Sequence, residues 1–315
     1  MKKFADRLNA AIRAKGTPIC VGLDPRLDKI PDFVKKHALE EAGGDPLAAA
    51  AEAMIAFDRG IIDAVADLVP VVKPQIAYYE VLGVEGMRAY QQTLSYAKSK
   101  GLLTIADAKR GDIGSTNEAY AKAYLSEPQF FGEHISTIHA DAITVSPFLG
   151  LASQASFVEL AQQQNRGVFF LVRTSNNDSG EFQLGTIQGG PQTLTDRLAS
   201  WVHQQGATLV GRSELSSIGA VVGATHPHEA HALRALMPNN FFLVPGYGAQ
   251  GGSAEGAVAG AIPNRDIHES GLVVNSSRGL FEGSTTAKST SEFQSQIRDN
   301  CKRAQGELVR ALSPK

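Results

Sequence analysis

The chain has 315 residues, of which 43% are hydrophobic, and its 30 basic and 32 acidic residues give a net charge of −2 at pH 7. This balance excludes the strongly basic surface with which proteins bind nucleic acids or anionic membranes, and the hydrophobic content excludes global disorder. The two cysteines, Cys20 and Cys301, lie far apart in the sequence. They make a disulfide framework unexpected and favour a reducing, cytoplasmic setting.

The first 16 residues, MKKFADRLNAAIRAKG, carry charges but are followed by no apolar segment. Their pattern predicts an amphipathic helix rather than a signal peptide. No apolar run approaches the roughly 18 residues that a membrane-spanning helix requires, so no membrane association is expected.

Beyond this helix, short apolar, β-branched runs alternate with longer amphipathic stretches. The apolar runs predict eight strands, near residues 18–23, 69–76, 102–107, 141–146, 167–173, 218–223, 241–245 and 271–275. The amphipathic stretches predict helices near residues 46–67, 84–100, 114–125, 150–164, 190–206, 226–237, 252–261 and 286–311. Two polar segments, 24–45 and 174–190, follow the first and fifth strands and are expected to be long loops.

The strands are apolar on both faces, which is typical of a parallel sheet covered by helices. Eight strand–helix units therefore predict an α/β fold, a (β/α)8 TIM barrel, as a single domain over residues 1–315. A doubly wound sheet split into two domains is the alternative, but no segment has the composition of a linker. In a barrel, both long loops lie at the carboxyl ends of the strands, where active sites occur.

Charged residues end three successive predicted strands. In the string TIADAKRGDIGST, Asp107 and Lys109 are two residues apart, a spacing that places both side chains on one face of a strand, and Asp112 follows an Arg-Gly turn. Lys73 ends the second strand and Asp24 ends the first. Salt bridges that close the barrel rim are the alternative interpretation. Because buried charges are costly unless paired, five of them at strand ends favour an active site.

Glycine-rich turns follow the last two strands, as GYGAQGG at 246–252 and NSSRG at 275–279. Such turns present backbone N–H groups to an anion, and Arg278 adds a bidentate partner for phosphate. The loops after strands seven and eight are also the usual phosphate site of such barrels. The pattern predicts a phosphate site, with two ordinary glycine turns as the alternative.

Two partial motifs indicate other cofactors only weakly. The string at 246–251 matches GxGxxG literally, but it lies in the seventh unit, and Asp266 comes too early for a ribose-binding acid, so no nicotinamide or flavin is expected. The string THPHEAHAL at 225–233 is one residue short of the zinc motif HExxH and has no third firm ligand nearby. We expect His226 near a helix start, before Pro227, and the other two histidines on a solvated helix face.

The sequence resembles the orotidine 5′-phosphate decarboxylase family, specifically its longer bacterial (type 2) subfamily. The strings that carry the resemblance follow the family's order, one per strand end: VGLDPR, VKPQIAYYE, DAKRGDIGST, VSPFLG, LVRTSN, VVGATHP, LVPGYGAQGG and VNSSRG. The D-x-K-x-x-D core at 107–112 is shared with related sugar-phosphate lyases, whereas the whole set is specific to the family.

The resemblance implies a (β/α)8 barrel that forms a homodimer with active sites at the interface. It also implies decarboxylation of orotidine 5′-phosphate to UMP, without a cofactor or metal, as the last step of de novo pyrimidine synthesis. By position, Lys109 matches the proton donor to C6 and Asp107 the carboxylate beside that of the substrate. Lys73 and Asp24 match the residues that bind the ribose hydroxyls and complete the network of charged side chains.

The same resemblance assigns roles to residues outside the central charges. Asp112 and Thr116 match residues lent to the partner's site, and Ser175 matches the pyrimidine contact. Gln250 and Arg278 match the groups that grip the phosphate. No role is assigned within 176–190 or after residue 280.

The chemistry of the residues agrees with this resemblance. Loss of CO2 from C6 leaves a carbanion without an adjacent carbonyl, and most enzymes would recruit an electron sink for it. A preorganised ammonium at C6 can stabilise the negative charge and then supply the proton. A barrel that only binds a phosphate ligand, a metal-dependent sugar-phosphate decarboxylase and a nucleotide-binding oxidoreductase are the alternatives, but every charged position that the decarboxylase needs is present.

Overall fold

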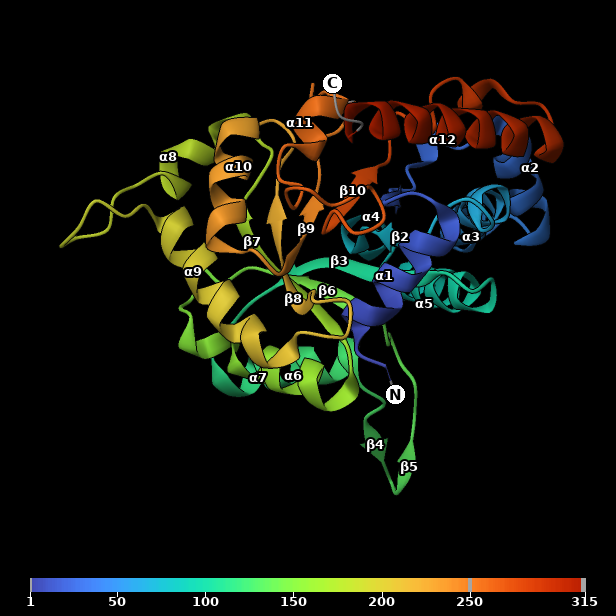
Figure 1. Cartoon of the computed structure of the whole chain (residues 1–315). Coiled ribbons are helices and arrows are strands. Elements are labelled where there is room, and N and C mark those ends of the chain that lie inside the picture. The colour runs from blue at the N-terminus through green and yellow to red at the C-terminus, as the bar shows by residue number, and fades with distance from the viewer. Residues whose placement is uncertain (1, 249–250, 313–315) are drawn as a thin grey trace.

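Eight parallel strands close into a barrel, in the order β1-β10-β9-β8-β7-β6-β3-β2 (Figure 1). This computed structural model describes residues 2–248 and 251–312. The strands are β1 Ile19–Leu23, β2 Val71–Pro74, β3 Leu103–Arg110, β6 Ala142–Val145, β7 Gly167–Arg173, β8 Ser216–Val222, β9 Asn240–Val244 and β10 Leu272–Ser276. Each predicted strand is confirmed to within a few residues, and the predicted (β/α)8 barrel is correct.

Helices follow the strands in sequence and cover the outside of the barrel (Figure 1). They are α3 Pro46–Val65, α5 Gly83–Ser99, α6 Gly114–Leu125, α7 Ala155–Gln164, α9 Leu194–Gly206, α10 Pro227–Leu236, α11 Ala254–Val258 and α12 Thr290–Leu312. They match the eight helical stretches predicted from the sequence, although α11 is shorter than expected. No helix in the described part of the chain is long and apolar enough to cross a membrane.

The predicted amino-terminal helix is present as α1, Phe4–Lys15. It closes the end of the barrel at which the strands begin. Its buried residues Phe4, Leu8 and Ile12 pack in one cluster with side chains from the strands, including Phe169. The rings of Phe4 and Phe169 meet edge to face at 6.1 Å. Gly167 makes this approach possible, because a Cβ at that position would come within 2.3 Å of the Phe4 ring.

The structure differs from prediction in the two segments expected to be loops. The segment 24–45 contains helix α2, Asp32–Glu41, whose only buried residues are Val34 and Ala38. Two buried apolar residues four positions apart do not form the repeating apolar pattern that identifies a helix in a sequence. The segment 174–190 likewise contains a short helix, α8 Gly180–Gln183.

Two further elements were not predicted. Helix α4, Ile76–Glu80, follows β2 directly. A hairpin of β4 Gln129–Phe130 and β5 Glu133–His134 projects from the barrel between α6 and β6 (Figure 1). All four strand residues of the hairpin are exposed, so the sequence there has no apolar alternation that would indicate a strand.

A buried carboxyl group joins three helices beside the strand that carries Lys73. Asp58 of α3 is fully buried and accepts hydrogen bonds from Tyr79 Oη of α4 at 2.5 Å and from Thr93 Oγ1 of α5 at 3.1 Å. Burial raises the pKa of Asp58 to about 7, and the two hydrogen bonds offset this only in part. The folded protein therefore binds a proton at this group that the unfolded chain releases at much lower pH.

We expect Asp58 to make the protein less stable as the pH rises. The unfolded carboxyl has a pKa of about 3.9, so between about pH 4 and pH 7 the folded state holds more protons, and the free energy of unfolding falls across this window. Asp58→Asn removes the titration. Between about pH 5 and pH 8 the wild type should lose several degrees of Tm relative to the variant. Asp63→Asn, on an exposed position of the same helix, is the control; equal pH dependence of wild type and Asp58→Asn would contradict the prediction.

Candidate active site

Three of the predicted residues meet at the carboxyl ends of the adjacent strands β2 and β3. Lys73 and Asp107 are 5% and 7% exposed. Lys73 Nζ lies 2.6 Å from Asp107 Oδ2, and Lys109 Nζ lies 2.7 Å from Asp107 Oδ1. Thr144 of β6 donates a hydrogen bond from Oγ1 to Asp107 Oδ1 at 2.9 Å. One buried carboxylate is thus held by two ammonium groups and a hydroxyl.

The charges of this cluster keep one another ionised. Burial alone would raise the pKa of Asp107, but the ammonium groups of Lys73 and Lys109 outweigh it and hold that pKa well below its usual range. Burial lowers the pKa of Lys73, yet the charges of Asp107 and Asp24 leave it above the usual value. Lys73 and Asp107 are therefore both charged at neutral pH. Asp24, at the end of β1, is half-buried, and its charge contributes to the raised pKa of Lys73.

The backbone of β3 is irregular where it presents Lys109. Lys109 has φ +44°, a left-handed conformation that side chains other than glycine rarely adopt. The pairing of β3 with β6 shifts register between Ala106 and Arg110, and the N–H groups of Ala108 and Lys109 both donate to Thr144 Oγ1, at 3.1 and 3.0 Å. The Lys109 side chain remains 47% exposed. Its ammonium group can therefore contact both Asp107 and a ligand in the barrel mouth.

Asp112 and Thr116 are not part of this cluster within one chain. Asp112 accepts a hydrogen bond on Oδ1 from the Ile113 N–H at 2.7 Å, and no ion pair joins it to a residue in the described ranges. Thr116 is exposed on the first turn of α6. The buried Asn117 fixes this turn, because its side chain bonds to both the N–H and the carbonyl of Asp112. The turn is ordered, but within the described ranges no hydrogen bond or ion pair joins Asp112 or Thr116 to the chain's own charge cluster.

The expected phosphate site lies at the carboxyl ends of β9 and β10. Gly246, Gly248 and Gly251 have φ of +95°, +77° and +87°, which the tight turn requires and which only glycine adopts without strain. Arg278 is exposed after β10, and its side chain makes no hydrogen bond or ion pair with another described residue. Gln250, predicted to grip the phosphate, lies outside the described residues.

Ser175 follows β7, on the same end of the barrel as the charge cluster. It is half-buried, and its carbonyl accepts a hydrogen bond from Thr225 Oγ1 at 3.1 Å, which connects it to the loop after β8. This position is compatible with the predicted contact to a ligand's polar ring.

Sequence reasoning missed two residues that organise these strand ends. Thr144 lies within the apolar run of β6. A hydroxyl in a buried run needs a hydrogen-bond partner, and this could have identified Thr144 as a site residue. Arg173 ends β7 inside the motif LVRTSN and is almost fully buried. It donates hydrogen bonds to Ser179 and Gln183 and forms an ion pair with Glu229 of α10 at 3.3 Å. Arg173 therefore holds the segment after Ser175 in place.

The histidines of 225–233 have the predicted helical setting. His226 is the N-cap of α10, Pro227 occupies its first turn, and His228 and His231 are exposed. Among residues 2–248 and 251–312, no group of three or more His, Cys, Asp or Glu side chains is arranged to hold a metal ion.

We expect Asp107→Ala to destabilise the protein because it leaves the buried Lys73 without its closest counter-charge. The free energy of unfolding should fall by about 3 kcal/mol, measured by urea denaturation. Adding Lys73→Met removes the unpaired charge and should restore at least about 1 kcal/mol. A double variant no more stable than Asp107→Ala would show that the buried pair is not the source of the loss.

Known proteins are similar to this chain over nearly its whole length. A family model described as orotidine 5′-phosphate decarboxylase / HUMPS family matches residues 17–293. The chain is 41% identical over 303 residues to the orotidine 5′-phosphate decarboxylase of Rhodopirellula baltica, covering 95% of this chain and 96% of the relative. It is 38% identical over 300 residues to that of Clostridium acetobutylicum, covering 95% and 94%.

A solved structure agrees with these relatives. The OMP decarboxylase of Leishmania donovani superposes with a TM-score of 0.69 at 25% identity, covering 97% of this chain and 98% of the other. The family match spans most of the chain, and both named relatives exceed 35% identity. The chain therefore belongs to the orotidine 5′-phosphate decarboxylase / HUMPS family.

Proposed function

We propose that the protein converts orotidine 5′-phosphate to UMP and CO2 without a cofactor, as a step of pyrimidine nucleotide biosynthesis. The observation that carries this proposal is the Asp107 carboxylate, buried between the ammonium groups of Lys73 and Lys109 at the carboxyl ends of two adjacent strands. Membership of the family and the activity named for its relatives support the same reaction.

In the proposed reaction, the bond between C6 and the carboxylate breaks, and its electron pair stays on C6 while CO2 leaves. Lys109 stabilises that charge and then transfers a proton from Nζ to C6, because its ammonium group is partly exposed and fixed by Asp107. Asp107 stays ionised because of its lowered pKa, so it holds this ammonium in place throughout. The amine left on Lys109 regains its proton from solvent.

The remaining predicted residues would hold the substrate. Asp24 and Lys73 are proposed to bind the ribose hydroxyls, and Ser175 the pyrimidine ring. Arg278 and Gln250 are proposed to bind the phosphate. The exposed guanidinium of Arg278 beside glycine-rich turns supports its part. Binding energy from the remote phosphate then contributes to orienting the reacting base.

We also propose a homodimer in which Asp112 and Thr116 enter the partner's site. Both residues follow β3, which lies between β2 and β6 in the barrel. The segments after these three strands expose large apolar side chains, as an interface does: Val81, Val84, Ile113, Phe148 and Leu149. A second copy would bury these side chains and bring a carboxylate to each charge cluster.

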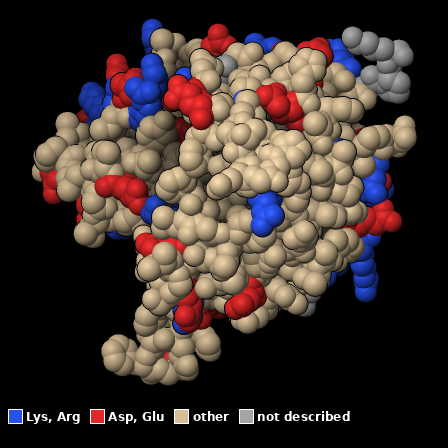
Figure 2. Space-filling model, turned by 90° about the vertical axis from the view of Figure 1, so that its left-hand side faces the viewer, with Lys and Arg blue, Asp and Glu red and all other residues tan. Residues whose placement is uncertain are grey.

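The proposed setting is the cytoplasm, with the chain acting as one domain. Cys20 and Cys301 are both free and buried, which suits a reducing compartment. The helices α1 and α12, at opposite ends of the sequence, both pack on the same barrel. Figure 2 shows acidic and basic side chains interspersed among uncharged ones on one face, and the net charge of −2 offers no excess of positive charge for binding a nucleic acid.

The first test is turnover after removal of metals. The purified protein, dialysed against EDTA, should decarboxylate orotidine 5′-phosphate at an undiminished rate, since Lys73 and Lys109 supply the positive charge; the change in absorbance follows the reaction. A strict need for added metal would indicate a metal-dependent sugar-phosphate decarboxylase. UMP binding without turnover would indicate a barrel that only binds its ligand.

Lys109→Ala should lower kcat by about a thousandfold, because it removes both the cation at C6 and the proton donor. Binding of UMP, measured by calorimetry, should remain within a few-fold of wild type, since the ribose and phosphate contacts persist. Lys122→Ala, an exposed lysine paired with Glu118 on α6, is the control and should keep full activity. Activity of Lys109→Ala within tenfold of wild type would refute its role.

Mixing inactive variants tests the shared site. Heterodimers of Asp112→Ala and Lys73→Ala should contain one site with both defects and one intact site. At equal mixing, about a quarter of wild-type activity should return if subunits exchange statistically. Asp107→Ala mixed with Lys73→Ala is the control, since both residues act in one chain and no activity should return. No recovery of the first pair after confirmed exchange would place Asp112 in its own subunit's site.

A further inference from the structure

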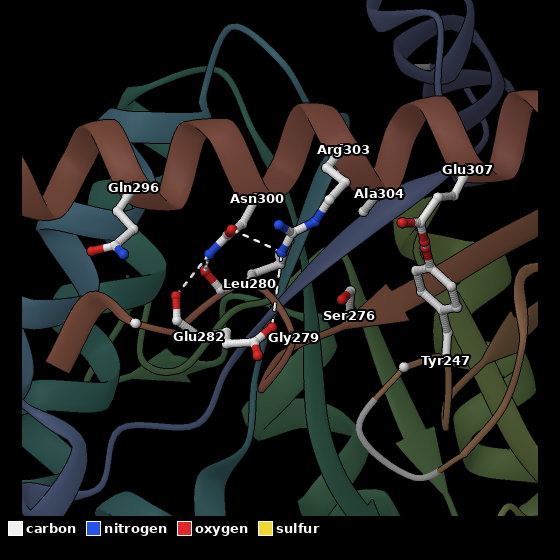
Figure 3. A pocket seen from close by; sticks show the side chains of 12 residues that line it. Tyr247, Ser276, Gly279, Leu280, Glu282, Gln296, Asn300, Arg303, Ala304 and Glu307 are labelled. Carbon is white, nitrogen blue, oxygen red and sulfur yellow. Dashed lines mark hydrogen bonds and ion pairs between the residues drawn. The ribbon is translucent and has the colours of Figure 1, made fainter.

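Helix α12 lies against the turns that follow β9 and β10. Figure 3 shows Asn300 and Glu307 on the side of this helix that faces Gly279 and Tyr247. A pocket of about 510 Å³ lies between the helix and these turns and is lined by residues of all three segments. The helix therefore adjoins the expected phosphate end of the site from outside the barrel.

Asn300 holds the turn after β10. It is 8% exposed, and its Nδ2 donates hydrogen bonds to the carbonyls of Leu280 and Glu282, each at 3.0 Å. The same turn contains Arg278, and it is closed by a hydrogen bond from the Leu280 N–H to the Ser277 carbonyl at 2.9 Å. One buried amide thus fixes two carbonyls within four residues of the arginine expected to bind phosphate.

Glu307 holds the turn after β9. The carboxylate accepts a hydrogen bond from the hydroxyl of Tyr247, a buried residue between Gly246 and Gly248. Burial and this carboxylate both raise the pKa of Tyr247, so the hydroxyl remains a hydrogen-bond donor at neutral pH. The glycine-rich turn is therefore tied to α12 by its aromatic side chain.

The two contacts are seven residues apart on a helix of 23 residues. Seven residues correspond to about two helical turns, or roughly 10.5 Å, and return to the same side of the helix. Because α12 is rigid over that length, the contacts of Asn300 and Glu307 fix the two turns relative to each other.

We propose that Asn300 and Glu307 are positioning residues for phosphate binding, acting through the turns that they hold. This inference rests on the proposed function, because it takes these turns as the site of the substrate's phosphate. Neither side chain need touch the ligand. Glycine-rich segments lose much conformational entropy when they are ordered, and α12 holds Tyr247, Leu280 and Glu282 in place before the ligand arrives.

The test compares ligands with and without the phosphate. Asn300→Ala should raise the Kd of UMP and of inorganic phosphate by about tenfold or more, because two carbonyls lose their donor and the turn loosens. The Kd of uridine, which lacks the phosphate, should stay within about twofold. Gln296→Ala is the matched control: Gln296 lines the same cavity one helical turn earlier, and its side chain makes no hydrogen bond to the described turn residues.

Tyr247→Phe provides a second, milder variant that removes one hydroxyl. It tests the positioning role of α12 if Asn300→Ala does not fold. It should weaken phosphate and UMP binding by about three- to tenfold, with uridine unchanged. Wild-type phosphate affinity in the folded variants, or equal losses for uridine and phosphate, would overturn the proposal. Because these are binding measurements, a wild-type protein that binds UMP but shows no turnover refutes the proposed function and leaves the positioning role testable.

Discussion

The Asp107 carboxylate is the group on which the arrangement of the catalytic end depends. A carboxylate this deeply buried is tolerated only with close counter-charges, and Lys73 and Lys109 supply them from two adjacent strands. That requirement fixes the relative position of β2 and β3 and leaves each ammonium group with little freedom. Electrostatic catalysis benefits from such fixed charges, because no reorganisation is needed when charge develops on the substrate.

The charge cluster and the proposed phosphate site lie on different strands at the carboxyl end of the barrel. The cluster is built on β2 and β3 with Thr144 of β6, whereas the glycine-rich turns and Arg278 follow β9 and β10. Each end also has its own support from helices. Asp58 joins α3, α4 and α5 beside β2, and α12 holds the turns at the other end. The charges proposed to act on the reacting carbon and those proposed to bind the phosphate can thus be positioned independently of each other.

The elements that could be predicted from the sequence are those in which burial leaves a repeating pattern. Parallel strands covered by helices are continuous apolar runs, so all eight barrel strands were found. Helix α2 buries only Val34 and Ala38, and the β4–β5 hairpin buries no strand residue, so neither has a pattern to detect. The spacing of two predicted only that Asp107 and Lys109 share one face of the strand. The left-handed backbone of Lys109 depends on Thr144 in another strand, which no local pattern encodes.

The charge balance of the cluster explains why a lysine can serve where other enzymes need an electron sink. Asp24, Lys73, Asp107 and Lys109 sum to zero if all four are ionised. A bound substrate carboxylate adds one negative charge, and loss of neutral CO2 moves that charge onto C6 rather than removing it. Delocalisation is not available at this carbon, so the charge must be met by a nearby cation and then by a proton. Lys109 is the member of the cluster that combines a fixed ammonium group with access to the barrel mouth, and it can provide both.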